Sequence, residues 1–438
     1  MRGDTARLRQ LIKSGADVNA AQGDGMTALH WIASRGDASG ARLLIAAGAQ
    51  LEAVTRNGKY TPLHLAARDG NAGVVKVLAA AGANVAAATT SGGATPLHLA
   101  AAIGNVDAIA ALLDKGAMVN VRDSAYAQTP LMWAAAYNRM AALQLLITRG
   151  ADLKAVSRVE DIPTRERTDR AAIALRNRRV AAVRAAEAPP GGRGQVEPPT
   201  PVMSIASLGF SGILPPDTAA AARAAAATAG RGGRGGAPGD TAGVGRGGGR
   251  GQSYGDLVGN KGGLTALLFA TREGHRDAAL ALLTAGADIN QKSADNTSPL
   301  LMATINGHFD LAKLLLLRGA NPKLASDAGA TPLYAVVNIQ WAAKSLYPQP
   351  VAHTKQQATY LDIMETLLKA GADPNARLTK HLWYMSYNFD LLGVNTTGSH
   401  ALLARRVWHR RARDAPAQEV RRRSHHRDAK AGGAQPES

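Results

Sequence analysis

The 438-residue sequence has no cysteine, few aromatic residues and no long hydrophobic segment. The absence of cysteine excludes disulfides and thiolate metal sites. No apolar run of about 18 residues occurs, so we expect no membrane-spanning helix. Aromatic residues make up only 4% of the chain, whereas hydrophobic residues make up 46%. This composition suits repeats filled with alanine and leucine, and the chain is too long for one compact core.

One stretch, TPLHLAARDGNAGVVKVLAAAGAN at positions 61–84, recurs along most of the chain. A threonine opens each copy at positions 27, 61, 95 and 129, with 34 residues from one copy to the next. The series resumes at Thr265, Ser298 and Thr331, now 33 residues apart. Copies close with a phrase such as Gly-Ala-Asp or Gly-Ala-Asn. A fixed period of this length indicates stacked helical units.

The residues of one copy predict two helices and a turn. Thr61 can cap a first helix, and Pro62 is pre-set for its first turn. Gly70 and Asn71 end this helix, and a second one follows with valines and a leucine at helical spacing. Gly82 supplies the left-handed residue that ends the second helix. Neither helix can bury its apolar side alone, so stability must come from neighbouring copies.

In helix order, period and residue pattern, these copies resemble the ankyrin repeat. His30, His64 and His98 occupy the histidine position of the T-P-L-H phrase. The resemblance covers about two-thirds of the chain and implies an all-α ankyrin-repeat solenoid, in which β-hairpin-like turns join helix pairs. We interpret the three histidines as structural, because repeats about 10 Å apart cannot share a metal.

The pattern divides the chain into four segments. Residues 1–152 hold half a repeat and four full repeats, and residues 153–262 form an Arg/Gly/Ala/Pro-rich insert that we expect to be mostly disordered, apart from one exposed helix at about 164–188. Residues 263–399 form a second array with two aromatic-rich insertions, and residues 400–438 form a basic tail. Because the insert replaces a turn, we expect the two arrays to stack as one solenoid; two separate arrays are the alternative.

The net charge of +18 is concentrated outside the repeats. The insert has 16 Lys and Arg against 9 Asp and Glu, and residues 401–438 have 10 against 4. Arginine in a glycine-rich segment can neutralise phosphates and stack on bases. Nucleic-acid association is therefore an alternative to a passive linker; its candidate residues are Arg231, Arg234, Arg246 and Arg250.

Protein-binding residues are expected at the turn tips and at the ends of the first helices, on one concave side. Each such residue alone could equally be ordinary solvated surface. The candidates are Asp24, Met26, Arg35, Arg56, Lys59, Tyr60, Arg68, Asp69, Tyr126 and Tyr137. Trp31 and Trp133 replace leucines of other copies, such as Leu65, and we interpret both as packing residues.

The seventh copy departs from the pattern. Its second-helix leucine pair begins 36 residues after Thr331 rather than 17, and the following turn is also overlong. Both insertions are rich in aromatic residues, which either recognise a partner or fold back over the edge of the solenoid. The additional binding candidates are Trp341, Trp383, Tyr384 and Tyr387.

Both ends of the sequence look irregular. Residues 1–4 match the middle of a copy, so we expect that Met1 is not the natural start. The basic tail could bind nucleic acid or membranes. However, permitted codons for residues 400–426, read one nucleotide later, spell TPFWRAAYGTDVPAMRLLKKYGADPTI, which is a complete repeat. We therefore interpret the tail as a frameshifted repeat.

No nucleophile–base pair, metal-ligand spacing or cofactor fingerprint emerges, so we expect no enzyme, metal site or cofactor. The leading hypothesis is a monomeric scaffold that binds another protein through its concave face and turn tips. The alternatives are nucleic-acid binding through the insert and a misread gene product without function as written. The sequence does not fix the compartment: the expectation for the chain as written is the cytoplasm, and export is the alternative if the true N-terminus lies upstream.

Overall fold

The computed structural model describes residues 5–187, 253–341, 351–380, 382 and 397–400. The chain forms two units: residues 1–168 together with 252–438, and residues 169–251. The described part of the second unit is the continuation of helix α10 (Ile162–Glu187), whose residues 169–183 are exposed. The helix predicted near 164–188 is thus present. Residues 188–252, which include Arg231, Arg234, Arg246 and Arg250, lie outside the described residues.

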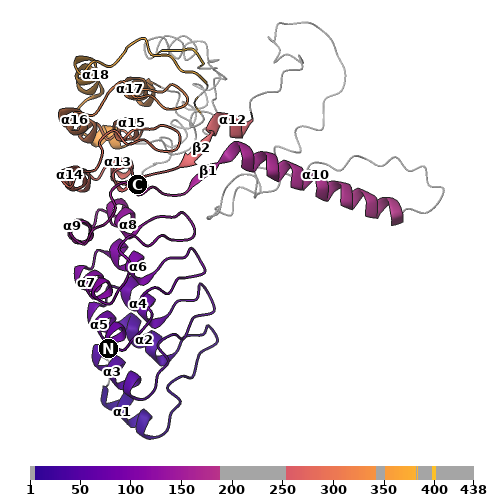
Figure 1. The fold of residues 1–438 in the computed structure, drawn as a ribbon, viewed down its shortest axis with the longest axis vertical. Helices are drawn as coiled ribbons and strands as arrows, with labels where there is room; N and C mark the ends of the chain where they lie inside the picture. Colours follow the sequence, from indigo (N-terminus) through magenta and orange to yellow (C-terminus); the bar gives the residue numbers. More distant parts are fainter. Residues whose placement is uncertain (1–4, 188–252, 342–350, 381, 383–396, 401–438) are drawn as a thin grey trace, which may run out of the picture. The chain divides into compact units, whose positions relative to one another are not determined.

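The large unit is a stack of helix pairs, as the repeat pattern predicts (Figure 1). The first helices of the copies are α2 (Ala28–Arg35), α4 (Pro62–Arg68), α6 (Pro96–Ile103), α8 (Pro130–Ala136), α13 (Ala266–Glu273), α15 (Pro299–Ile305) and α17 (Pro332–Trp341). The second helices are α1 (Thr5–Lys13), α3 (Ala38–Ala46), α5 (Ala72–Ala80), α7 (Val106–Asp114), α9 (Met140–Thr148), α14 (Arg276–Thr284), α16 (Phe309–Leu317) and α18 (Tyr360–Lys369).

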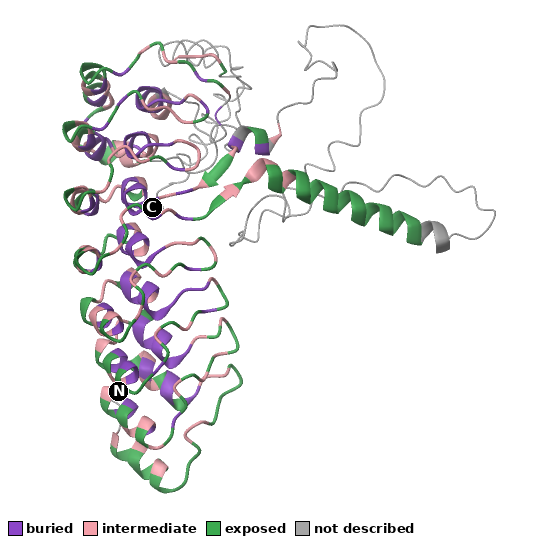
Figure 2. Cartoon of the chain, in the orientation of Figure 1, coloured by how far each residue is buried: buried purple, intermediate pink, exposed green. Residues whose placement is uncertain are grey.

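Each first helix packs on the next one in an unbroken series from α2 to α17. The series includes α8 and α13, which lie on either side of the insert in the sequence. One apolar cluster runs through all copies, with Leu63, Leu97 and Leu267 fully buried at the same position of three of them. Figure 2 shows buried residues all along the stacked helices. The two arrays therefore share one core.

The T-P-L-H histidines link consecutive copies, which confirms their structural role. The backbone N–H of Thr61 donates to His64 Nδ1 (3.2 Å), so the proton of the neutral ring lies on Nε2. His64 Nε2 then donates to the carbonyl of Ala94 in the next copy (3.3 Å). His30 and His98 make the same link to Tyr60 and Gln128. All three rings are fully buried.

The insert leaves the stack through one of its turns. Strand β1 (Val159–Asp161) pairs antiparallel with β2 (Asn260–Gly262). Just before β1 and just after β2, the Ser157 N–H donates to Leu264 O (2.9 Å). In an uninterrupted turn the Thr55 N–H donates to Tyr60 O in the same way. The short helix α12 (Tyr254–Val258) is held by Glu166, which accepts the Gly255 N–H (2.8 Å). These parts of the range 153–262 are therefore ordered, and the Ser157 bond among them is the one that closes the other turns.

The insertion in the seventh copy ends against the sixth copy. The 3-10 helix η2 (Ala352–Lys355) precedes α18, and the Asp310 carboxylate accepts the N–H groups of Gln357 (2.9 Å) and Ala358 (2.8 Å). His353 lies beside Phe309, with 6.2 Å between ring centroids. The described end of this insertion therefore folds back on the stack, while residues 342–350 lie outside the described residues. Within the part of the chain that the structure describes, no helix is long and apolar enough to span a membrane.

Replacing residues 162–259 by Asn-Gly should leave the stack intact. The paired ends of β1 and β2 suit a two-residue type I′ turn, and the packing of α8 on α13 does not involve the removed residues. We expect a urea midpoint close to that of the full chain and one concerted transition, measured by far-UV circular dichroism. Two separated transitions would contradict one shared core.

Stability should fall as the pH drops from about 6.5 toward 4. Burial lowers the pKa of His64 from 6.5 to about 4, so the unfolded chain takes up this proton before the folded chain does. The contribution of His64 to the free energy of unfolding is therefore fully present above the unfolded pKa of about 6.5. It is lost on acidification toward pH 4, by about 3 kcal/mol for this one group. Urea unfolding at several pH values, compared with His64→Gln, measures the effect. If the free energy of unfolding depends on pH as steeply in His64→Gln as in the unmodified chain, other groups cause the effect.

Candidate functional site

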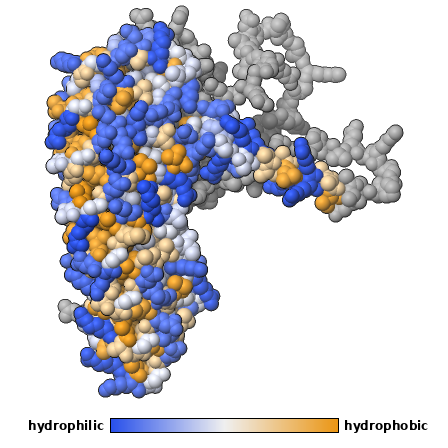
Figure 3. All heavy atoms as spheres, viewed as in Figure 1, coloured by the Kyte–Doolittle hydropathy of each residue, from blue (hydrophilic) through white to orange (hydrophobic). Residues whose placement is uncertain are grey.

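The turns that precede the first helices, together with the exposed ends of those helices, form one side of the stack, which we call the turn face (Figure 1). Figure 3 shows hydrophobic residues exposed along the repeat stack among hydrophilic ones. Separately from that colouring, the large side chains exposed on the N-terminal array include Trp31, Ile103, Tyr126 and Tyr137, which are 40–60% exposed. Tryptophan and tyrosine are enriched among the residues that dominate binding energy at protein interfaces, so these exposed rings are candidates for contact with a partner.

Trp31 is exposed, so its interpretation as a packing residue is wrong. Among residues 5–27 no first helix precedes α2, and the indole is left 40% accessible. Its Nε1 donates to Gln22 Oε1 (3.2 Å), and the Arg35 guanidinium lies 5.8 Å from the ring centroid. Trp133, in contrast, packs edge-on against His98 and donates to Asp123 Oδ2 (3.2 Å). Trp133 is thus a packing residue, as predicted.

Arginine stacks on an aromatic ring at two further places. Arg68 lies 6.0 Å from the Tyr60 ring centroid, which brings together two predicted site residues. Arg272 lies 4.9 Å from the ring of the buried Phe269. Phe269 and Arg272 were missed because their pairing depends on side-chain direction; their i, i+3 spacing on one helix is the only sequence signal. Such contacts hold the guanidinium groups in place at the surface.

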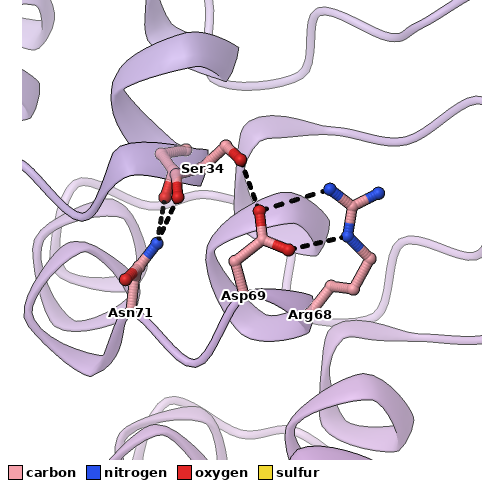
Figure 4. A network of polar contacts seen from close by, with 5 residues as sticks. Ser34, Arg68, Asp69 and Asn71 are labelled. Carbon is pink, nitrogen blue, oxygen red and sulfur yellow. Dashed lines mark hydrogen bonds and ion pairs between the residues drawn. The ribbon is translucent and has the colours of Figure 1, made fainter.

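Arg68 and Asp69 belong to a polar network that bridges two copies (Figure 4). Arg68 donates through Nε to Asp69 Oδ1 (2.9 Å), and the Ser34 hydroxyl donates to Asp69 Oδ2. Partial burial acts to raise the pKa of Asp69, but the hydrogen bonds from Arg68 and Ser34 outweigh it and hold that pKa below its usual value. The carboxylate therefore stays charged and fixed at neutral pH.

The ends of the first helices are tied to the following copy by a second set of hydrogen bonds. Asn71 Nδ2 donates to the carbonyls of Ala33 and Ser34, both at 2.8 Å. The residue at this position in other copies does the same with different chemistry: Asn105 to Gly70 O, Arg139 to Ala102 O, His275 to Ala136 O and His308 to Arg272 O. The His275 bond (3.0 Å) joins the two arrays. These bonds fix the backbone of the turn face.

The other predicted residues are placed as follows. Asp24 is exposed and accepts the Met26 N–H (2.9 Å), while Met26 is half-buried. Arg56 and Lys59 are exposed, and Lys59 has a left-handed backbone (φ 51°). Tyr126 and Tyr137 are exposed before and after helix α8 of the fourth copy, so they belong to a different copy from Trp31 and Arg68. Trp341 ends α17, but its side chain is not among those described; Trp383, Tyr384 and Tyr387 lie outside the described residues.

No group of three or more metal-ligating side chains occurs within the described ranges. What the turn face offers is aromatic rings and fixed guanidinium groups. Charged side chains stabilised by neighbours, together with exposed rings, can hold a complementary chain without much ordering on binding.

Comparison with known families identifies the repeats. The family model described as "Ankyrin repeats (3 copies)" matches residues 1–89 and 85–157. The model described as "Ankyrin repeat" matches residues 262–294 and 295–327. Together these matches cover just over half of the chain and both sides of the insert. None of the curated proteins compared with the chain matches it.

Asn71→Ala should destabilise the chain by about 1–2 kcal/mol, because two carbonyls at the end of α2 lose their donor. Asn57→Ala is the matched control: Asn57 lies exposed at a turn tip, where substitution changes stability by less than about 0.5 kcal/mol. Urea midpoints of the two variants test this directly. Equal midpoints would show that the cross-copy bonds do not stabilise the stack.

Proposed function

Because the chain belongs to the ankyrin repeat family, whose repeats are generally protein–protein interaction modules, we propose that it is a non-enzymatic scaffold that binds another protein through the turn face. The observation that carries the proposal is the exposed Trp31 with Arg35 beside its ring. Tryptophan and arginine are enriched among the residues that dominate binding energy at protein interfaces.

The charge of the turn face indicates what kind of partner it can bind. On the first two full copies the turn face carries Arg35, Arg56, Lys59 and Arg68 against Asp24 and Asp69. The Asp69 carboxylate is already engaged by Arg68 and Ser34. The surface therefore favours a segment that carries acidic residues around an apolar or aromatic side chain, because complementary charge raises association rates and rejects basic competitors.

The rigidity of the face supports this role. Its backbone is fixed by bonds between copies, such as those of Asn71 and Asn105, before any partner arrives. Adjacent turns are joined as well: Arg56 N–H donates to Asp24 O (2.8 Å) and Thr90 N–H to Gly58 O (2.9 Å). Binding to a preformed surface avoids the free-energy cost of ordering loops.

Peptides selected from a random library on the immobilised full chain should test the assignment. We expect enrichment of acidic residues flanking an apolar one, and at least a tenfold loss of affinity in both Trp31→Ala and Arg68→Ala. The matched controls lie on second helices: Leu317→Ala for the exposed apolar residue, and Lys76→Ala for the cation paired with an aspartate. Loss of binding in the controls, with full binding in the turn-face variants, would place the site elsewhere.

A further inference from the structure

Each turn of the stack closes with one backbone bond that marks where the next first helix begins. The residue just before the capping threonine or serine accepts an N–H from the start of its turn. Thr55 donates to Tyr60 O, Thr89 to Ala94 O and Ser293 to Thr297 O, all at 3.0 Å. A side chain of the preceding copy reaches the same acceptor residue, as His64 reaches Ala94. These two contacts identify the position that precedes a helix.

Ser399 occupies that position in the last described turn. Leu378 donates its N–H to Ser399 O (3.0 Å), and Arg377 pairs with His400 in an antiparallel bridge. Tyr334, three residues after Thr331 as His64 is three after Thr61, places its hydroxyl 3.4 Å from Ser399 Oγ. The structure thus positions residue 400 where another copy has its helix-capping threonine.

The face that an eighth copy would cover is apolar and incomplete. Leu368 is 44% exposed, although its equivalents are half-buried in copies that another helix pair follows. These equivalents are Leu113, Ile147, Leu283 and Leu316. In the other layer, Asn338 Oδ1 is buried and has no hydrogen-bond partner among the described residues. The equivalent of Asn338 in the first full copy is Ser34, which bonds to Asp69 of the next copy.

We propose that the end face formed by α17 and α18 docks one further repeat, and that this repeat is encoded one nucleotide out of frame from the codon of His400. The shifted reading, TPFWRAAYGTDVPAMRLLKKYGADPTI, starts with the threonine and proline that open a first helix. The turn geometry at Ser399 and the start of the shifted reading point to the same residue, His400, and the turn geometry does not depend on codons.

The shifted reading also matches the copy at Thr61 further along. Its alanine pair coincides with Ala66-Ala67, one of its leucines with Leu78, and its Gly-Ala-Asp with the Gly-Ala-Asn that begins at Gly82. Its first glycine comes one residue earlier than Gly70 does, and its second proline falls in the first turn of the second helix, where proline is tolerated. The apolar side of such a helix pair is complementary to the exposed Leu368.

The first test compares the full chain with a chain in which residues 400–438 are replaced by the 27 residues of the shifted reading. Hydrogen exchange of the α18 amides should slow by at least about tenfold when the repeat is present, because a terminal repeat gains a stacking neighbour. Leu368→Asp should abolish this protection, whereas Leu317→Asp, on the exposed side of α16, should not.

Unchanged α18 exchange after the replacement would overturn the proposal. So would protection of α18 in the original chain that grows with protein concentration, since a second molecule of the protein would then cover the end face. The coding claim has its own test in the nucleotide sequence across codons 397–426. An inserted or missing base there, with codons that permit the shifted reading, supports the proposal; codons that forbid it refute it.

Discussion

Every helix pair in this chain depends on apolar surface that it shares with the next pair. Leu63, Leu97 and Leu267 are buried at the same position of three different copies, and no copy encloses a core of its own. This dependence explains why the stack tolerates an insert at a turn tip, where little shared surface lies. It also explains why Leu11 and Leu368, on the outermost second helices that the structure describes, are 44% exposed.

Hydrogen bonds between copies fix how each helix pair is aligned with the next one. Apolar contacts alone do not specify this register. Buried histidines connect each early copy to the next. The N-cap residues of α5, α7, α9, α14 and α16 reach back to the end of the first helix in the preceding copy. Where the insertion disrupts the seventh copy, the Asp310 carboxylate and the Gln357 and Ala358 N–H groups take over this linking role. The same bonds hold Arg68, Asp69 and their neighbours in fixed positions on the turn face, which suits a surface that recognises a partner without rearranging.

The features that recur in every copy could be predicted from the sequence. The features that depend on contacts between neighbouring copies could not. Period, threonine caps and glycine stops were enough to predict the helix pairs, because these are local properties of each copy. The structural role of His64 followed from the spacing of the histidines, which is too wide for a shared metal. The exposure of Trp31 depends on which helix lies beside it, so its residue type alone was misleading. The bonds of Asn71, Arg139 and His275 also escaped prediction, since three chemically different side chains perform one task.

The central claim is that the two arrays are one continuous stack, and native-state hydrogen exchange tests it most directly. If α8 and α13 support each other across the insert, as the His275 bond to Ala136 O implies, their amides should be among the most protected in the chain. Protection should then decline toward α1 and α18. If α8 and α13 instead exchange as fast as the ends of the stack, the arrays are separate and the account is wrong.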